Sequence, residues 1–568
     1  MTALQVRRRA SGDPGALPPQ LHPVLRRVYA ARGVDAGALT LDLRDLLPPH
    51  SLRGLDAAVD LLRSALHDGR RIVIAGDYDA DGATGCAVGV LGLRALGASQ
   101  VDYVVPDRFR MGYGLSPALA ELAAARGAQL LVTVDNGIAS VAGVARAQAL
   151  GLQVLITDHH LPGPELPAAE ALVNPNQPGC PFPSKHLAGV GVMFYLLLAL
   201  RARLREDGAF AGREPPNLAE LLDLVAVGTV ADVVRLDRNN RILVEQGLRR
   251  LRAGRARPGL MALLQVAGRD PARLGAQDLG FVLGPRINAA GRLEDIRTGI
   301  DCLLAPDLET ALPLARALDR YNRERRELEA QMRAEAEVLV GDCSDDTGIS
   351  LFDPSWHEGV VGLVASRIKE REHRPVFAFA RAQDPGWLKG SGRSIPGFHL
   401  RDALAAIDAR HPGLLARYGG HAMAAGLSLR EERLPQFRAL FAAECRRTLS
   451  EDVLQRLLET DGELATAELS LETAQALETA GPWGQGFPEP LFEGRFQVAD
   501  VRCVGADGAH VKYRLRHSGG TVTAMDFGGA ERLHSVGSLH LVYALSVNRW
   551  QGNESLDLRI QHLEPIDG

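Results

Sequence analysis

Acidic side chains at alternating positions follow one of the most apolar runs of the chain. Asp77, Asp79 and Asp81 occur in GDYDADG, directly after RIVIAG (71–76). If the chain stays extended there, the three carboxylates point to the same side. Like charges this close repel one another, and a divalent cation is the usual compensation. The motif therefore predicts a metal site at the end of a strand.

Other apolar runs end in residues of the same kinds. These are Asp135 after LLVTV, the triplet Asp158-His159-His160 after VLIT, and Asp232 in AVGTVADVV. Parallel strands place their carboxyl ends along one sheet edge, so we expect these side chains to share one crevice. A lone Asp after a strand is usually a helix cap, but four such sites make capping a poor explanation of the set. For Asp77 and Asp158 individually, a structural or supporting role stays open beside direct ligation.

The chemistry of this ligand set indicates two metal ions. Mixed carboxylate and imidazole ligands suit Mn²⁺, and Mg²⁺ less well, whereas the sequence has no CxxC pair that would indicate structural zinc. Two ions about 3.5–4 Å apart and bridged by a carboxylate would activate a water and stabilise an in-line phosphoryl displacement. The set therefore predicts a two-metal site suited to phosphoryl displacement.

The elements that position these residues alternate between strands and helices. From about 51 to 300, β-rich runs alternate with Ala/Leu-rich stretches, which predicts a parallel α/β sheet with helices on both faces. The charged stretch 316–337 predicts a long exposed helix, and five β-type runs after GPWGQGFPEP (481–490) predict an OB-like barrel. We expect an irregular or partly helical lead-in over 1–50, a parallel α/β domain over 51–305, a connecting helix over 306–340, a second α/β domain over 341–450 and an all-β domain over 451–568.

Composition is that of a globular protein, with 46% hydrophobic and 23% charged residues. No apolar run reaches the ~18 residues of a membrane span, and the basic N-terminus has no apolar stretch behind it, so we expect no membrane association and a cytoplasmic location. The net charge of −5 argues against nonspecific nucleic-acid binding, but a cluster of metal-binding carboxylates would itself make the total negative, so the total charge decides little. Only four of the 64 basic residues are lysine; arginine grips phosphate bidentately, although a GC-rich genome would explain the same bias.

The motifs GDYDADG, VDNG, TDHH and ADVV, in this order, resemble the DHH phosphoesterase family, and further runs resemble its RecJ branch. Those runs are DHHLPG, VNPNQPGCPFPSKHLAGVGVMFYLL, GPRINAAGR and GGHAMAAG. The resemblance implies a DHH domain, a connecting helix, a DHH-associated domain and an OB-like domain. It also implies Mn²⁺-dependent 5′→3′ degradation of single-stranded DNA to 5′-mononucleotides in DNA repair and recombination. A nucleoid location, a helicase and a single-strand-binding protein are the expected context.

The resemblance also assigns the ligands. Those carried over by motif are Asp79 and Asp135 for one ion, and Asp81, Asp135, His159 and Asp232 for the other. His160 would face the scissile phosphate. Relatives that hydrolyse pyrophosphate carry a His near the position of Ala75, so here Asp77 or water is expected to complete the first site. Phe487 stands where the family often has Asn, which puts only local loop contacts in doubt.

Two glycine-rich motifs are expected to bind the substrate. Arg286, Asn288 and Arg292 lie in GPRINAAGR, and Arg393 lies in GSGRS, where backbone amides and guanidinium groups could together hold phosphate. His421 in GGHAMAAG resembles a substrate-contacting His of the family. We expect Arg286, Asn288 and His421 to act in catalysis with His160 and Asp135, and Arg292 and Arg393 to bind phosphate. A solvated surface role stays open for any single Arg.

Three further features concern recognition. Arg108 or Arg110, in PDRFRMGYGL, is expected to contact the 5′ end of the DNA, whereas His357 in SWHEG suits a structural role at a helix start equally well. In HVKYRLRH, apolar residues alternate with Lys512, Arg514 and Arg516, which predicts a basic strip that follows a single strand, with Trp550 as a stacking platform. A half-exposed strand that binds nothing remains the alternative.

Two other functions are alternatives to a polymer nuclease. Other DHH enzymes, such as phosphatases of short oligonucleotides or 3′-phosphonucleotides and cyclic-dinucleotide phosphodiesterases, need only the first two domains. An added barrel of about 80 residues supplies binding length that a dinucleotide cannot use. A catalytically inactive DHH scaffold is the other alternative, but every ligand position is filled in this sequence.

Overall fold

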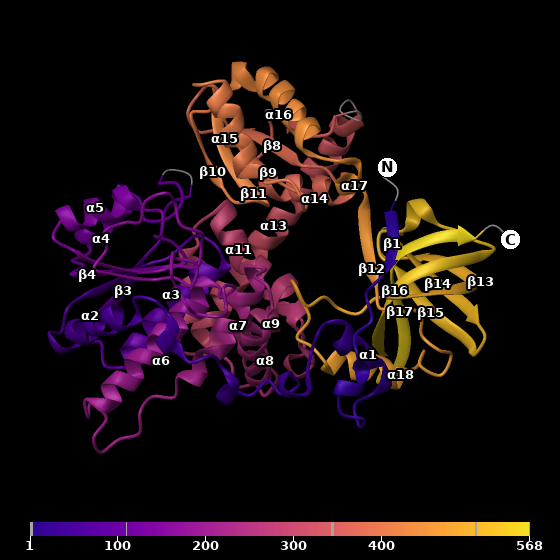
Figure 1. Cartoon of the computed structure of the whole chain (residues 1–568), viewed down its shortest axis with the longest axis horizontal. Helices are drawn as coiled ribbons and strands as arrows, with labels where there is room; N and C mark the ends of the chain where they lie inside the picture. Colours follow the sequence, from indigo (N-terminus) through magenta and orange to yellow (C-terminus); the bar gives the residue numbers. More distant parts are fainter. Residues whose placement is uncertain (1–3, 109–110, 342–345, 506–507, 567–568) are drawn as a thin grey trace.

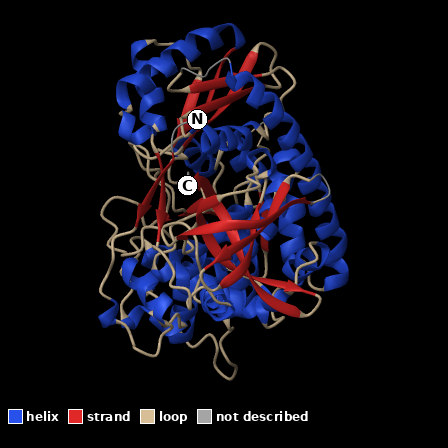
Figure 2. Cartoon of the chain, turned by 90° about the vertical axis from the view of Figure 1, so that its right-hand side faces the viewer, coloured by secondary structure: helices blue, strands red, loops and turns tan. Residues whose placement is uncertain are grey.

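The computed structural model describes residues 4–108, 111–341, 346–505 and 508–566. Figure 1 shows an α/β body at the left and centre, a second lobe at the top and a β-barrel at the right. In the side view of Figure 2, the barrel faces the viewer and the second lobe lies above it. Within the described ranges, every helix is too short or too polar to span a lipid bilayer.

The first sheet has five parallel strands in the order β3-β2-β4-β5-β6. They are β2 (Ile72–Ala75), β3 (Val101–Val104), β4 (Leu130–Val134), β5 (Gln153–Thr157) and β6 (Ala171–Val173), and the covering helices are α2 (Leu55–His67), α3 (Ala80–Ala95), α4 (Pro117–Ala125), α5 (Val141–Ala149) and α6 (Gly189–Glu206). Ile72 and Ile74 pack in the cluster of α2, α3 and α6, whereas Val73 and Ala75 pack with α4 and α5. Helices therefore cover both faces, as the continuous apolar runs predict.

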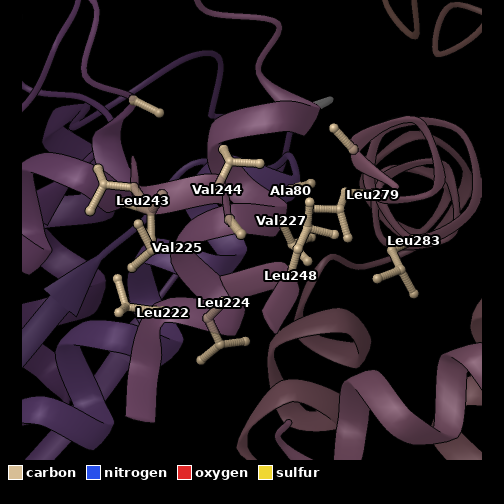
Figure 3. Close-up of a cluster of buried hydrophobic side chains, with 14 of the residues drawn as sticks. Ala80, Leu222, Leu224, Val225, Val227, Leu243, Val244, Leu248, Leu279 and Leu283 are labelled. Atoms are coloured by element: carbon tan, nitrogen blue, oxygen red, sulfur yellow. The ribbon is translucent and has the colours of Figure 1, made fainter. Parts of the chain in front are cut away.

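A group of helices beside this sheet forms the centre of the body. They are α7 (Leu222–Ala231), α8 (Arg238–Arg252), α9 (Pro258–Val266), α10 (Ala276–Asp278), α11 (Gly284–Leu293) and α12 (Arg297–Leu304). The sequence of α7, LDLVAVGTVA, is apolar on all sides, as expected of a helix that is surrounded by protein. Figure 3 shows its side chains packed against those of α8 and of the π-helical turn before α11. This packing fixes Asp232, the C-cap residue that directly follows α7.

The connecting helix is α13 (Leu308–Gly341), which extends beyond the charged stretch 316–337 at both ends. Its first turns carry Ala311, Ala315 and Leu318, all fully buried in the body's core. The second lobe is a five-stranded sheet in the order β10-β11-β9-β8-β7, in which only β7 and β8 run parallel. Its elements are β7 (Ile349–Phe352), α14 (Val361–Glu372), β8 (Val376–Arg381), β9 (Trp387–Arg393), α15 (Leu400–Arg410), β10 (Arg417–Gly420), β11 (Ala424–Arg430) and α16 (Leu434–Thr448).

The C-terminal part is a closed barrel in the order β13-β14-β15-β17-β16, which confirms the predicted OB-like fold. The parallel pairing of β15 with β17 closes the barrel. Its elements, after α17 (Glu451–Leu454), are β12 (Arg456–Thr460), α18 (Leu471–Thr479), β13 (Phe492–Val504), β14 (His510–His517), β15 (Gly520–Asp526), β16 (Ser538–Trp550) and β17 (Asn553–Ile566).

The N-terminal lead-in contains a strand that the sequence pattern did not predict. β1 (Leu4–Arg8) pairs in parallel with β12, the strand that precedes the barrel, and α1 (Pro23–Ala31) follows it. Figure 1 shows β1 beside β12 at the right of the molecule. Arg32, just after α1, forms an ion pair of 2.6 Å with Asp461, and both side chains are less than 5% exposed. The lead-in therefore ties the barrel to the body.

Candidate metal centre and substrate cleft

The acidic strand ends meet at one edge of the first sheet. Asp77 follows β2, Asp135 follows β4 and Asp158 follows β5. Because β4 lies between β2 and β5, Asp135 occupies the middle position, and the strand ends share one edge as the strand-end argument predicts. Its φ of +63° is the left-handed conformation, which Asp tolerates better than most residues and which occurs often at functional sites. Asp232 reaches the same edge from the end of α7.

Our sequence argument assumed that the GDYDADG segment is extended, but in the structure it is not. Helix α3 already begins at Ala80, and Asp79 is its N-cap, with Oδ1 accepting hydrogen bonds from the amides of Asp81 and Gly82. Asp is a preferred N-cap residue, and the helix start turns Asp81 away from the alternating pattern. The two oxygens of Asp81 instead accept hydrogen bonds from the amides of Gly189 (2.6 Å) and Val190 (2.9 Å), at the start of α6.

The carboxylate and imidazole groups gather in overlapping sets. In each of three sets, the potential ligand atoms lie within 4.8 Å of one another. The first set is Asp77, Asp79 and Asp135, the second is Asp81, His159 and Asp232, and the third is Asp135, His159 and His160. Asp135 belongs to two of the sets, and so does His159. The sets show that the side chains predicted as ligands come together, and that Asp77 lies among them.

Buried atoms without hydrogen-bond partners test whether these residues suit a metal ion. Asp77 Oδ1, Asp135 Oδ1 and His159 Nε2 are such atoms. His159 Nε2 lies 3.0 Å from Asp135 Oδ1 and 3.4 Å from Asp232 Oδ2, yet it has hydrogen-bond geometry with neither. Buried polar atoms in proteins are normally satisfied, so atoms that converge without bonding indicate a ligand-binding centre. The oxygen and nitrogen donors fit Mn²⁺ or Mg²⁺.

The electrostatics of the centre also favour a cation. Burial, followed by repulsion from Asp232, raises the pKa of Asp81 to about 7, and burial with repulsion from Asp79 raises the pKa of Asp232 to about 8. Burial and the neighbouring carboxylates raise the pKa of Asp135 well above its usual value. A divalent cation among these groups would remove the repulsion. Burial lowers the pKa of His159, which favours the neutral imidazole that binds metals.

His160 is held by Asp158. Nδ1 of His160 lies 2.8 Å from Asp158 Oδ1, which also accepts the amides of residues 159 and 160, and Asp158 Oδ2 accepts the amide of Ile138. Burial acts to lower the pKa of His160, but the hydrogen bond and the charge of Asp158 outweigh it and raise the pKa to about 9. The ring of His421, from the second lobe, stacks on that of His160 with centroids 5.4 Å apart. The two lobes therefore meet at His160.

Arg286 and Asn288 of the GPRINAAGR motif contact different parts of the body. The guanidinium of Arg286 pairs with Asp319 of α13 at 2.9 Å and donates to the carbonyl of Val282. Asn288 Oδ1 accepts a hydrogen bond from the amide of Ala80 (2.7 Å), the first residue of α3. Both side chains therefore form hydrogen bonds within the protein: Arg286 to α13 and Val282, and Asn288 to the start of α3.

Three arginines gather between the lobes without a carboxylate partner in the described chain. The Arg108 guanidinium lies 4.7 Å above the ring of Tyr78, Arg292 donates to the carbonyl of Gly359, and Arg393 donates to its neighbouring carbonyl. Burial, followed by the charge of Arg108, lowers the pKa of Arg292 to about 9 and that of Arg393 to about 10. Like charges held together in this way indicate an anion site. Arg110 lies outside the described residues.

Comparisons with known proteins agree with this arrangement. Family models match residues 71–229 (DHH family, N-terminal domain), 340–447 (DHHA1 domain) and 460–562 (RecJ OB domain). The chain is 52% identical to the "Single-stranded-DNA-specific exonuclease RecJ" of Salmonella typhimurium and to that of Escherichia coli, over 99% of both chains in each case. The chain belongs to the RecJ family. A crystal structure of RecJ from Thermus thermophilus in complex with Mn²⁺ superimposes with a TM-score of 0.81 and 34% identity, over 99% of this chain and 80% of that one.

Within this RecJ-family site, sequence reasoning missed two residues. The Tyr113 hydroxyl donates to the carbonyl of Asp135 (3.1 Å) and lies 3.0 Å from His160 Nε2, while half of the side chain stays exposed. Gly189 packs so closely on the metal centre that a Cβ there would lie 2.5 Å from the Cβ of Asp135. The glycine before an apolar helix was the available signal for such a close approach. His357 accepts a hydrogen bond from the amide of Gly359, which suits a role in shaping the start of α14.

The barrel of this RecJ-family chain carries the predicted alternation on β14. Val511, Tyr513 and Leu515 are fully buried. The basic strip (Lys512, Arg514 and Arg516) faces outward, with Lys512 half-buried and both arginines exposed. Trp550, at the end of β16, is 70% exposed. These residues have the exposure that contact with a nucleic-acid strand requires.

Proposed function

We propose that the chain is a metal-dependent exonuclease that degrades single-stranded DNA in the 5′→3′ direction to 5′-mononucleotides, with two divalent metal ions and a preference for Mn²⁺ over Mg²⁺. The relatives are named single-stranded-DNA-specific exonucleases, and RecJ crystal structures from Thermus thermophilus are described with Mn²⁺ and with Mg²⁺. The observation that carries the proposal is the pairing of a carboxylate and imidazole centre, whose buried atoms lack partners, with an adjacent cluster of unpaired arginines.

The overlapping sets of carboxylate and imidazole groups support the proposal of two ions. Asp79 and Asp135, with Asp77 beside them, would hold one ion, and the other ligands are Asp81, Asp135, His159 and Asp232. Bound divalent ions supply Lewis acidity and lower the pKa of a coordinated water. Asp135 is central because it belongs to sets on both sides of β4.

The other side chains orient these groups and the substrate. Asp158 fixes the ring of His160, and we assign His160 and His421 to contact with the scissile phosphate because both rings line the junction of the lobes. Asn288 holds the start of α3, which carries Asp81, so it acts as a positioning residue. Arg286 joins α11 to α13 through its ion pair with Asp319 and positions the substrate-binding segment.

The arginine cluster supports recognition of a strand end. A terminal phosphate monoester carries about −1.5 to −2 charges at pH 7, whereas an internal phosphodiester carries one. Three guanidinium groups that lack carboxylate partners in the described chain therefore favour the terminal group. We assign Arg108, Arg292 and Arg393 to the 5′-phosphate, and the RecJ-family membership supports this polarity.

The barrel is proposed to bind the strand that leads into the cleft, through the basic strip and Trp550. An enzyme restricted to single strands needs another protein to open duplex DNA. We therefore propose a helicase and a single-strand-binding protein as partners, and DNA repair and recombination at the nucleoid as the setting.

The direct test follows product release from end-labelled single strands. We expect mononucleotides to appear only from the 5′ end, faster with a 5′-phosphate than with a 5′-hydroxyl, in Mn²⁺ and not in EDTA. Release from the 3′ end, or full activity in EDTA, would contradict the proposal.

Two variants separate the roles within the centre. Asp135→Asn should weaken Mn²⁺ binding in calorimetric titrations and abolish turnover, because it removes a charge from both ligand sets. His160→Ala should retain Mn²⁺ binding while turnover decreases by about 10²–10³, the usual loss for one transition-state donor. Loss of Mn²⁺ in His160→Ala as severe as in Asp135→Asn would show that His160 is a ligand.

A further inference from the structure

Two adjoining hollows lie at the opposite end of α7 from the metal centre. Asn217, just before α7 and its preceding turn, lines both of them, whereas Asp232 follows the helix. Ten helical residues separate these ends by about 15 Å at 1.5 Å per residue. Figure 1 shows α6 and α8, which contribute to the hollows, at the lower edge of the body, with the second lobe at the top. The hollows are therefore separate from the catalytic cleft.

Arginine dominates the walls of both hollows. The larger, of about 430 Å³, is lined by Arg250, Arg255 and Arg257, and the smaller, of about 310 Å³, by Arg201 and Arg205. We call these five residues the distal arginine site. Arg201 and Arg205 come from the last turns of α6, whereas the other three come from the end of α8 and the turn that leads into α9, which lie far from α6 in sequence.

The positive charge of the distal arginine site is not balanced. None of its five arginines forms an ion pair within the part of the chain that the structure describes, although Arg249 and Arg252, on the same helix as Arg250, both pair with Glu245. Glu220 lines the larger hollow. The buried Asp223 lies beneath, but its oxygens accept hydrogen bonds from two backbone amides, one of them that of residue 257. Two carboxylates against five guanidinium groups leave a clear positive excess.

Donors in the larger hollow also lack acceptors. The Nε atoms of Arg250 and Arg257 are buried and have no hydrogen-bond partner among the described residues. Arg250 is meanwhile fixed by a hydrogen bond from Nη2 to the carbonyl of Arg255 (2.8 Å), and Arg201 by one to the carbonyl of Pro216 (3.1 Å). These hydrogen bonds fix the positions of two of the five guanidinium groups, and neither group forms an ion pair within the described residues.

The lining residues identify phosphate as the ligand chemistry. Guanidinium groups match phosphate oxygens bidentately, and the residues that line the two hollows include no aromatic side chain on which a base could stack. Five arginines spread over two adjoining hollows, which share Asn217 in their lining, suit successive phosphates better than a single ion. We propose that the distal arginine site binds the phosphodiester backbone of single-stranded DNA outside the catalytic cleft. This inference rests on DNA as the proposed substrate, and not on the metal ions or the polarity.

The test uses the two exposed members of the site. Arg205→Ala combined with Arg255→Ala removes two charges without disturbing a buried group. The matched control is Arg44→Ala combined with Arg381→Ala, which removes two exposed arginines that do form ion pairs elsewhere. Fluorescence anisotropy would measure binding of a strand that fills only the catalytic cleft and of a much longer strand. Omitting divalent metal prevents cleavage, and a salt series gives the slope of log affinity against log salt.

We expect the site variant to bind the long strand about tenfold more weakly at low salt, with a salt slope smaller by about 1.4 for two lost phosphate contacts. The site variant should bind the short strand as tightly as the wild type does. The control variant should bind both the short and the long strand with wild-type affinity. An unchanged slope would overturn the inference and point to another anion, such as an acidic protein segment. An equal loss with the short strand would also overturn it. Cleavage of the short strand in Mn²⁺ tests the proposed function separately, because the distal arginine site plays no part there.

Discussion

Adding a single methyl group at Gly189 should strongly disturb the candidate metal centre. It is the first residue of α6, and its amide donates to Asp81. A Cβ at this position would lie 2.5 Å from the Cβ and 2.9 Å from the Oδ1 of Asp135. We therefore expect Gly189→Ala to displace the central carboxylate while every ligand residue is still present.

The size of the effect follows from the distances. A contact of 2.5 Å is about 1 Å shorter than the usual separation of roughly 3.5–4.0 Å between carbon atoms. A misplacement of about 1 Å at a reacting group costs about 10²-fold in rate. Overpacking of a tight core costs about 1–3 kcal/mol of unfolding free energy. Gly189→Ala should thus lower turnover about a hundredfold and weaken Mn²⁺ binding, with only a moderate loss of stability.

The assay compares this variant with Gly191→Ala, in the same first turn of the helix. A Cβ at Gly191 would meet only the flexible end of Leu187, at 3.3 Å, so both variants gain the same helix propensity but only one disturbs Asp135. Exonuclease rates, calorimetric Mn²⁺ titrations and thermal unfolding would be measured for both. If Gly189→Ala were as active as Gly191→Ala, Asp135 would not be packed against α6 as described.

Three further predictions concern other parts of the chain. Replacing the basic strip of β14 by alanines should lower the salt slope of binding to long strands by about 2, whereas a merely solvated strip would leave it unchanged. Arg32→Ala should lower the unfolding free energy by about 3 kcal/mol, because it leaves Asp461 buried without its main partner; denaturant unfolding with a loss below about 1 kcal/mol would contradict this. Hydrogen bonds from Arg447 and Arg410 hold the pKa of Glu444 below its usual value. The stabilisation is therefore present at neutral pH and lost as the pH decreases through that lowered pKa, so the unfolding free energies of wild type and Glu444→Gln should differ at neutral pH and converge in acid.

The strand-end argument brought the predicted ligand residues to one sheet edge because it depends only on sheet geometry. The acidic strand ends were expected to share one crevice, and Asp77, Asp135 and Asp158 do lie at one edge of the sheet. The conformation of GDYDADG was not predicted correctly, because the sequence allows both an extended segment and a helix start at Asp79. In the structure, the start of α6 packs against the amino end of α3 and donates a hydrogen bond to Asp81. This contact joins residues that are more than a hundred positions apart, so the local sequence does not reveal it.

Contacts between residues that are distant in the chain could not be predicted from the sequence either. The residue pattern of GPRINAAGR suggested that Arg286 faces the substrate, but its ion pair with Asp319 depends on how α11 packs on α13. The distal arginine site was hidden for a different reason. With arginine common along the whole chain, no local pattern distinguishes the five that gather around these two hollows, and only the folded structure reveals them.

The pairing of β1 with β12 has a consequence for the order in which the protein assembles. Arg7 and its partner Glu459 are 452 positions apart in the chain. At a synthesis rate of about 5–20 residues per second, β1 leaves the ribosome roughly 20–90 seconds before β12 exists. During that time the body and the second lobe can fold, while the first strand waits as an exposed edge. Closure of this strand pair therefore comes late in biosynthesis, and it joins the beginning of the chain to the segment before the barrel only after the body and the second lobe have been synthesised.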